Sequence, residues 1–338
     1  MSVALVPGGW KGDNAVANHP RADVNRSSYL ESWSGMLSIA PIDLHLSVGS
    51  HTAAAGRETN EDAVLVTQLP EHEPGAGPGF LLAVADGMGG HQRGEVASQT
   101  AIELLNDLFA RDRPEDIAQA LKQAYRRANE AIFQQAALTP DQGPMGTTLV
   151  SAVISGKYVT IANVGDSRAY LVRANQLTQI TQDHSLVAEQ VAQGQLTEEA
   201  ARRSPQRNII TQSLGTSGTL DRRMPSIYEL VLLPEDRLLL CSDGFFDVLM
   251  NEDYVSALIS DDPQESAAQL VTLASQRGAS DNVSAVIVAA SPSLAFVQRE
   301  QIGLEIAEQR RTSSLLLPVA MLLIVLIAIA IGIFFYLG

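Results

Sequence analysis

The chain has 338 residues, and 23 Lys and Arg against 38 Asp and Glu give it a formal net charge of −15. A hydrophobic fraction of 46% with only 18% charged residues excludes an intrinsically disordered chain. The acidic balance argues against a nucleic-acid-binding protein, which needs a basic face. The single cysteine, Cys241, excludes a disulfide framework and a cysteine-rich metal site, and it fits a reducing compartment.

Residues 1–41 mix Gly, Asn, Ser and Pro without sustained periodicity, which predicts a flexible N-terminal arm. The apolar run Ser2–Pro7 is too short for a secretory signal peptide and lacks a basic start. We therefore expect the folded region to begin near Ile42.

Between Ile42 and Ala290 the hydrophobic pattern alternates between strand-like and helix-like segments. The predicted strands are Leu44–Val48, Ala63–Gln68, Phe80–Ala85, Thr148–Ile154, Val159–Asn163, Ala169–Arg173, Leu238–Cys241 and Val283–Ala289. The predicted helices are Glu95–Phe109, Pro114–Ala137 with Pro114 in its first turn, and a segment to about Gln276 with Asp262 as N-cap and a reaching Glu265. Strands that come in consecutive pairs, with helices following in pairs, favour an α+β fold with antiparallel sheets.

The segment Leu315–Leu337 contains no charged residue. At ~1.5 Å per residue its 23 residues would span roughly 35 Å as a helix, enough to cross a bilayer. The alternative, a buried core helix, is disfavoured because the segment lacks any polar periodicity. We therefore predict a transmembrane helix, preceded by a juxtamembrane linker over residues 291–314. Arg310 and Arg311 predict that the linker side is cytoplasmic.

Acidic residues flank several of the predicted strands. Asp86 and Asp243 each end an apolar strand, Asp166 lies in a turn between two strands, and Asp281 and the pair Glu61–Asp62 precede strands. Any one of them could be an ordinary turn residue, since Asp-Gly is a common turn dipeptide. Together they would repel one another, and buried carboxylates are costly unless they are solvated, paired or bound to a metal. The set therefore favours a cation site.

The ligand types indicate which cation this site would take. No His/Cys pair has zinc spacing, whereas carboxylates and a glycine carbonyl are hard oxygen ligands that suit Mg²⁺ or Mn²⁺. Two such ions ~3.5–4 Å apart can activate a water and hold a phosphoryl oxygen. Arg57, four residues before Glu61, could supply an anion anchor.

Six motifs occur in the order found in one enzyme family. They are RETNED (Arg57–Asp62), ADGMGGHQRGEVAS (Ala85–Ser98), GTT (Gly146–Thr148), VGDSRAYL (Val164–Leu171), CSDGFFD (Cys241–Asp247) and SDN (Ser280–Asn282). Over about Ile42–Ala290 the chain resembles the type 2C metal-dependent protein serine/threonine phosphatases in their bacterial form. The resemblance implies two central antiparallel sheets flanked by helix pairs.

The resemblance also implies roles for individual residues. Asp86 would bridge two Mn²⁺ or Mg²⁺ ions, with the Gly87 carbonyl and Glu61 completing one site. Asp243 and Asp281 would hold the other ion.

Two further roles follow from the same resemblance. Asp166, with Asp243, would match a third, weaker ion of bacterial members. Arg57 would bind the substrate phosphate. Residues of about 183–214 would form a mobile flap beside the active site. One position departs from the family, because Met88 stands where many members, chiefly eukaryotic ones, carry a histidine proposed as the general acid.

Other phosphatase chemistries are excluded by specific residues. A cysteine-dependent phosphatase needs Cys-x5-Arg, but Asp247 lies six places after Cys241. An aspartyl-phosphate enzyme needs an aspartate two places before Asp243, where Cys241 stands. No phosphate-binding GxxxxGK[ST] loop supports an NTPase. Cys241 is interpreted as a small core residue.

These observations predict a membrane-anchored protein serine/threonine phosphatase in which a metal-activated water attacks the phosphate. Its expected partners are phosphoproteins, including serine/threonine kinases, and no nucleic acid. We expect a single-pass protein of the cell membrane with its catalytic domain on the cytoplasmic side. The alternative is a catalytically inactive, membrane-tethered docking module that retains the fold.

Overall fold

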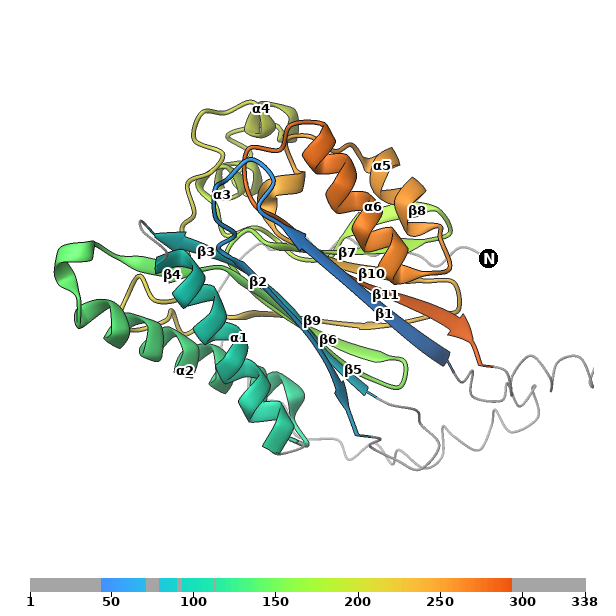
Figure 1. Ribbon diagram of the computed structural model, residues 1–338, viewed down its shortest axis with the longest axis horizontal. Coiled ribbons are helices and arrows are strands. Elements are labelled where there is room, and N and C mark those ends of the chain that lie inside the picture. Colours follow the sequence, from blue (N-terminus) through green and yellow to red (C-terminus); the bar gives the residue numbers. More distant parts are fainter. Residues whose placement is uncertain (1–43, 71–78, 90–92, 112–113, 294–338) are drawn as a thin grey trace, which may run out of the picture. The chain divides into compact units, whose positions relative to one another are not determined.

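Two antiparallel sheets form the centre of the computed structural model, which describes residues 44–70, 79–89, 93–111 and 114–293 (Figure 1). The first sheet has the order β1 (Leu44–Ala53), β11 (Val283–Pro292), β10 (Arg237–Cys241), β7 (Arg168–Arg173) and β8 (Gln176–Gln179). The second has the order β2 (Asp62–Leu69), β3 (Gly79–Gly89), β5 (Leu149–Ser155), β6 (Tyr158–Val164) and β9 (Ser226–Val231), and the short β4 (Met145–Thr147) pairs with β3. The predicted α+β class with two antiparallel sheets is confirmed.

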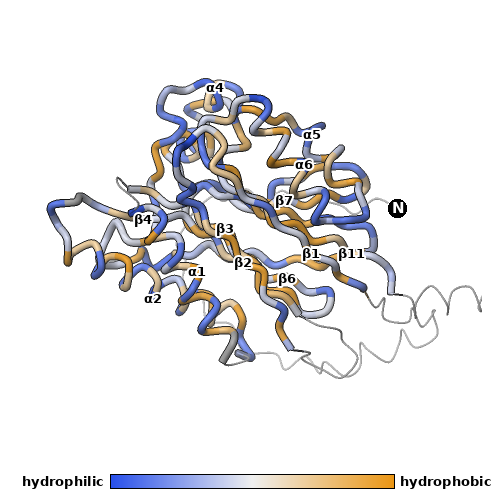
Figure 2. The backbone as a smooth tube through the Cα atoms, viewed as in Figure 1, coloured by the Kyte–Doolittle hydropathy of each residue, from blue (hydrophilic) through white to orange (hydrophobic). Residues whose placement is uncertain are grey.

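The inner faces of the two sheets pack against each other. Leu82 and Ile161 from the second sheet share one buried cluster with Leu238 and Val286 from the first. Figure 2 shows hydrophobic residues concentrated along these central strands and hydrophilic residues in the loops around α4 (Glu198–Arg202). The alternation of side chains along each strand sends the remaining apolar residues to the outer faces.

Helix pairs cover those outer faces. The helices α1 (Arg93–Arg111) and α2 (Ile117–Ala137) pack on the second sheet. The helices α5 (Asn251–Leu258) and α6 (Pro263–Gln276) pack on the first. The layers therefore follow the order helices, sheet, sheet, helices, which explains why the central strands read as continuous apolar runs.

The strand register defines two ends of this sandwich. At one end Asp62 lies opposite Asp86, and Ala53 lies opposite Val283; we call this the acidic end. At the other end Leu44 lies opposite Pro292, where β1 begins and β11 ends; we call this the exit end. All the aspartates predicted as metal ligands lie at the acidic end.

The three predicted helices are present, but α1 extends two residues beyond the predicted Glu95–Phe109 at each end, and α5 was not predicted. Asp262 caps α6 as predicted, since its carboxylate accepts from the backbone N–H groups of Gln264 and Glu265. Glu265 itself accepts from the Ser260 hydroxyl. The prediction that Pro114 lies in the first turn of α2 is wrong. That helix begins at Ile117, because the Asp116 carboxylate caps it by accepting from Gln119 N–H.

The strands are longer and more numerous than predicted. The strand β1 continues to Ala53 and β3 continues through Gly89, so Asp86 lies inside its strand and does not end it. Three strands were missed because they are short or half exposed, namely β4, β8 and β9.

Some predictions lie outside the described residues. They concern the arm over residues 1–41, residues 90–92 of the motif Ala85–Ser98, the linker after Ser293, and the transmembrane helix Leu315–Leu337. Among the helices that the structure describes, none is both long enough and apolar enough to cross a bilayer.

Candidate metal centre

Asp86 is fixed by its own strand and by the neighbouring GTT segment. Its backbone N–H donates to the Thr148 hydroxyl at 3.0 Å, and its carbonyl accepts from the Thr148 N–H and the Thr147 hydroxyl, both at 2.9 Å. Burial raises the pKa of the Asp86 carboxyl well above its usual value, and the charge of Asp62 adds to the effect. A buried carboxyl with acidic neighbours retains its proton unless a cation is near.

Asp62 lies directly across from Asp86 on β2. Its Oδ2 accepts from the Ser242 hydroxyl at 2.8 Å and from the Ser284 hydroxyl at 2.6 Å, whereas its buried Oδ1 has no hydrogen-bond partner among the described residues. Burial raises the pKa of Asp62 to about 7 despite those two donors.

Glu61 and Gly87 approach each other beside the start of α1. An ideal Cβ on Gly94 would lie 2.6 Å from Glu61 Oε2 and 2.7 Å from the Gly87 carbonyl oxygen. Only a glycine at position 94 therefore leaves room for both oxygens. These are the two groups predicted to complete one metal site with Asp86, and the structure brings them together.

Asp243 and Asp281 come from two adjacent strands of the first sheet. Asp243 opens a short 3-10 turn (Asp243–Phe245) directly after β10, and Asp281 lies two residues before β11. Burial, followed by the charge of Asp281, raises the pKa of Asp243 to about 6. One oxygen of Asp243, Oδ1, is buried without a partner among the described residues.

Asp166 lies in the turn between β6 and β7, as predicted. Burial, followed by the charge of Asp243, raises its pKa to about 8, and its buried Oδ1 has no partner within the described ranges. The turn is held by His184, whose Nδ1 accepts from the Gly165 N–H at 3.0 Å. Burial lowers the pKa of His184, in keeping with a neutral ring that accepts at this nitrogen.

Arg57 lies on the loop that joins β1 to β2. Its Nη2 contacts Asp281 Oδ2 at 2.7 Å, and its Nε donates to the Ser280 carbonyl at 3.2 Å. The Arg57 side chain is still 55% exposed. A guanidinium has five N–H donors in a planar fork, so an exposed one at the edge of a carboxylate cluster can meet a phosphate.

Asn282 connects the loop between β1 and β2 to the start of β11 through hydrogen bonds. Its Nδ2 donates to the carbonyls of Ala54 at 3.1 Å and Thr59 at 2.9 Å, and its Oδ1 accepts from the Glu61 N–H at 2.9 Å. One side chain thus positions both Arg57 and Glu61. We infer a positioning role that the SDN motif alone did not reveal.

The predicted flap leaves the acidic end and returns to it. It contains α3 (Leu186–Ala192) and α4, on either side of Gly194. The Arg168 guanidinium contacts Asp183 at 2.6 Å at the beginning of the flap, and Leu214 forms a bridge with Thr147 at its end. Arg207 contacts Asp247 at 2.8 Å, which connects the flap to the segment after Asp243.

The donor set fits hard divalent cations. Three carboxylates, those of Asp62, Asp166 and Asp243, each have a buried oxygen without a partner among the described residues, although a buried polar atom is normally hydrogen-bonded. In that same part of the chain no three His, Cys, Asp or Glu side chains form a ready-made metal site. Mg²⁺ keeps several waters and takes one or two carboxylates, so a dispersed set with a backbone carbonyl suits it better than a tight protein cage.

All the predicted site residues that the structure describes meet at the acidic end. The ligand role of each remains a prediction. Sequence reasoning did not assign roles to Asp62, Asn282 or His184. Asp62 could have been found from the pairing of β2 with β3, which puts it opposite Asp86.

The sequence and the fold are similar to those of bacterial phosphatases. The family model "Protein phosphatase 2C" matches residues 46–190. The serine/threonine phosphatase stp of Listeria monocytogenes is 35% identical over 237 residues, which cover 69% of this chain and 90% of that protein. This chain belongs to the protein phosphatase 2C family, whose members are metal-dependent protein serine/threonine phosphatases.

Two comparisons with phosphatases named PstP add to this. The chain is 41% identical to the serine/threonine protein phosphatase PstP of Mycobacterium tuberculosis over 207 residues, 61% of this chain, and it spans only 40% of the length of that protein. The crystal structure of the PstP catalytic domain in complex with two manganese ions has a TM-score of 0.63 and 36% identity, and covers 73% of this chain and 99% of that one. The similarity therefore concerns the catalytic domain.

Proposed function

We propose that this chain hydrolyses phosphoserine and phosphothreonine in proteins with the help of two Mn²⁺ or Mg²⁺ ions at the acidic end. The observation that carries the proposal is the convergence of carboxylates at Asp62, Asp166 and Asp243, each with a buried oxygen that has no hydrogen-bond partner among the described residues. The manganese-bound PstP catalytic domain supports the choice of ion.

The acidic residues of the chain would bind the metal ions. Asp86, Asp243, Asp281, Glu61 and the Gly87 carbonyl would hold the two ions, and Asp166 with Asp243 would hold a third. When bound, the ions would supply Lewis acidity and lower the pKa of water so that it becomes a nucleophile at neutral pH.

Arg57 would orient the phosphate. Its guanidinium is exposed beside Asp281, so that a phosphate at the edge of the cluster could form charge-assisted hydrogen bonds with it. Met88 lies on β3 opposite Gly146 and has no proton to donate. The proton for the leaving alkoxide must therefore come from water or from another group at this end of the sandwich.

We also propose that Leu315–Leu337 anchors the enzyme in the cell membrane with the catalytic domain in the cytoplasm. The uncharged run and the preceding Arg310 and Arg311 support this. Membrane-bound phosphoproteins, including serine/threonine kinases, would then be the substrates that the enzyme meets most often.

The test uses the full chain in detergent. Hydrolysis of p-nitrophenyl phosphate and of a phosphothreonine peptide is measured with Mn²⁺, with EDTA, and for the variant Asp243→Asn. We expect Mn²⁺-dependent turnover that Asp243→Asn abolishes. No turnover at saturating Mn²⁺ in a folded protein would support the alternative, a tethered docking module.

A further inference from the structure

A group of exposed apolar side chains lies at the exit end. Tyr158 is 63% exposed, Val231 39% and Leu233 43%. Tyr158 and Val231 are register partners on β6 and β9, and Leu233 follows just after β9, with the buried Leu232 between the exposed Val231 and Leu233. With the flanking cations Lys157 and Arg173 they form what we call the exit patch.

The two cations are held against the apolar residues. Lys157 Nζ lies 5.7 Å from the centre of the Tyr158 ring. Arg173 Nη2 donates to the Val231 carbonyl at 2.8 Å, and the same side chain, 43% exposed, pairs with Asp236. An aromatic ring with aliphatic side chains and cationic stems is the composition that favours a lipid–water interface.

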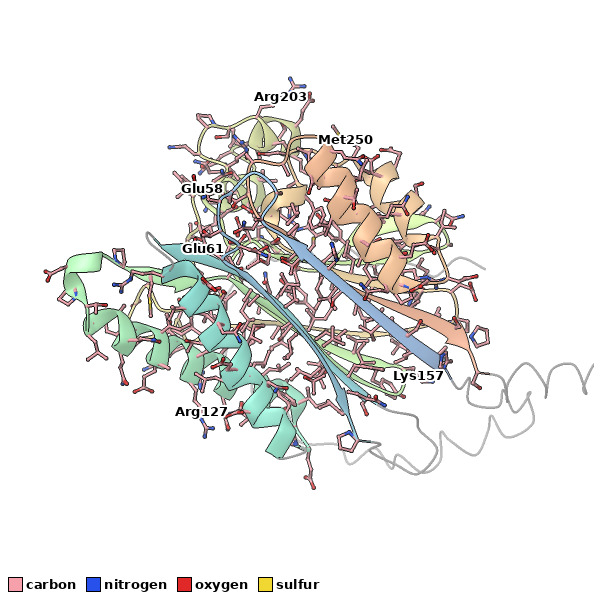
Figure 3. The ribbon with its side chains drawn as sticks, viewed as in Figure 1. Glu58, Glu61, Arg127, Lys157, Arg203 and Met250 are labelled. Carbon is pink, nitrogen blue, oxygen red and sulfur yellow. The ribbon has the colours of Figure 1, made fainter. Side chains whose placement is uncertain are left out.

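The exit patch lies beside the point where the chain leaves the sandwich. Glu235 N–H donates to the Ala290 carbonyl at 2.8 Å, and Ala290 N–H donates to the Asp236 carbonyl at 3.0 Å, so the turn after Leu233 contacts the end of β11. Figure 3 shows Lys157 toward the end of the sandwich where β1 begins and β11 ends, whereas Glu58 and Glu61 lie toward the other end.

Only 22 residues separate Pro292 from the uncharged run that begins at Leu315. If that run is in the bilayer, the exit end is held close to the lipid surface. A contact that would be too weak between free molecules is populated when a short tether raises the effective concentration to the millimolar range.

We propose that the exit patch rests on the lipid interface, with the apolar side chains among the phosphodiester headgroups and Lys157 and Arg173 facing the phosphates. This inference rests on the proposed membrane anchor. A second copy of the chain is a poorer occupant, because Glu229 lies on the same face of the edge strand β9 and charged edge residues oppose strand addition.

The orientation has a consequence for substrate choice. The strand β1 has ten residues, so the acidic end lies about 30 Å from the exit end at ~3.3 Å per residue. With the exit patch on the bilayer, the candidate metal centre faces the cytoplasm. It would reach phosphorylated residues well above the membrane surface and not those next to it.

The experiment places fluorescent labels at the two ends of the full chain in vesicles of phosphatidylcholine and phosphatidylglycerol that contain headgroup-nitroxide lipids. Cys241 is fully buried, so a cysteine introduced by Gln176→Cys at the exit end or by Glu58→Cys at the acidic end can be labelled selectively. We expect several-fold stronger quenching of the label at position 176 than of the label at position 58.

The variant Leu233→Glu, alone and with Tyr158→Glu, should remove most of that difference. The matched control is Leu138→Glu, because Leu138 is 81% exposed but lies at the end of α2, away from the exit patch. This control should preserve the quenching pattern, and all these variants should retain turnover of p-nitrophenyl phosphate and co-float with the vesicles.

The other outcomes overturn the inference at different points. Co-flotation with equal quenching at both positions, or quenching that Leu233→Glu does not change, contradicts the exit patch while leaving the anchor intact. A chain that does not co-float contradicts the anchor itself. A dimer in detergent that Leu233→Glu dissociates would assign the exit patch to a second copy.

Discussion

Asp62 and Asp86 lie directly opposite each other on β2 and β3, and the register of this one strand pair brings two carboxyls with raised pKa values together. Like charges directly opposite on a sheet destabilise the pair. The arrangement therefore costs stability in the metal-free protein and favours a cation between the sheets.

The first prediction concerns Asp62→Asn. The new Oδ1 can still accept from Ser242 and Ser284, while one negative charge is removed. In EDTA we expect a gain in unfolding free energy on the order of 1 kcal/mol. In Mn²⁺ we expect weaker metal affinity by calorimetric titration. The exposed-acid variant Glu252→Gln serves as control, and a loss of stability in EDTA would contradict the prediction.

The second prediction concerns pH. The folded-state pKa of Asp62 is raised to about 7 and that of Asp166 to about 8, above unfolded values near 3.9. The folded state thus binds more protons between these limits, and the free energy of unfolding without metal should rise as pH falls from 8 to 5. The slope should be about 1.4 kcal/mol per pH unit for each carboxyl that titrates fully.

Denaturant unfolding at several pH values measures this slope. With excess Mn²⁺ the trend should reverse, because metal binding requires deprotonated ligands. The double variant Asp62→Asn/Asp166→Asn should reduce the slope in EDTA without abolishing it, because the pKa values of Asp86 and Asp243 are raised as well. If that variant keeps the full slope, the effect comes from other groups and not from Asp62 and Asp166.

The third prediction concerns Arg57→Ala. A charged hydrogen bond is worth ~1.5–3 kcal/mol, so kcat/KM for a phosphopeptide should fall roughly ten- to a hundredfold, mainly through KM. Thermal stability should change little, because the pair with Asp281 is substantially exposed. The control Arg223→Ala removes another exposed ion pair. Lower Mn²⁺ affinity with an unchanged KM would mean that Arg57 positions Asp281 instead.

The fourth prediction concerns Asn282→Asp. The change keeps the acceptor for the Glu61 N–H but turns a carboxylate oxygen toward the carbonyls of Ala54 and Thr59. We expect faster hydrogen exchange over residues 54–61 and at least a tenfold loss of turnover. Asn106→Asp is the matched control. The Asn106 Oδ1 accepts a hydrogen bond from the Thr67 hydroxyl, and an aspartate at this position can still accept it. Unchanged hydrogen exchange over residues 54–61 would contradict the proposed positioning role of Asn282.

The sequence allowed the central strands and the acidic end to be predicted for a physical reason. Strands β3, β5, β10 and β11 are buried on both faces, so they appear as unbroken apolar runs with polar residues beyond them. The exposed β8 and the alternating β9 lack that signal because tertiary pairing, not composition, makes them strands.

The finer parts of the site depend on contacts that are distant in sequence. Asn282 reaches back more than two hundred residues to the Arg57 loop, and Arg57 meets Asp281 across the same separation. The motifs indicate which residues lie at the acidic end. Which of these residues are in contact depends on the strand register and on the conformation of the loops.

The pairing of β1 with β11 has a consequence for biosynthesis. β1 is an edge strand whose sheet neighbour is β11, and Ala53 is separated from its partner Val283 by some 230 residues. At ~5–20 residues per second, roughly ten to fifty seconds of translation pass before that neighbour exists. During this interval the nascent chain exposes an unpaired strand edge, so its yield in cells should depend on holdase chaperones and on the speed of the ribosome.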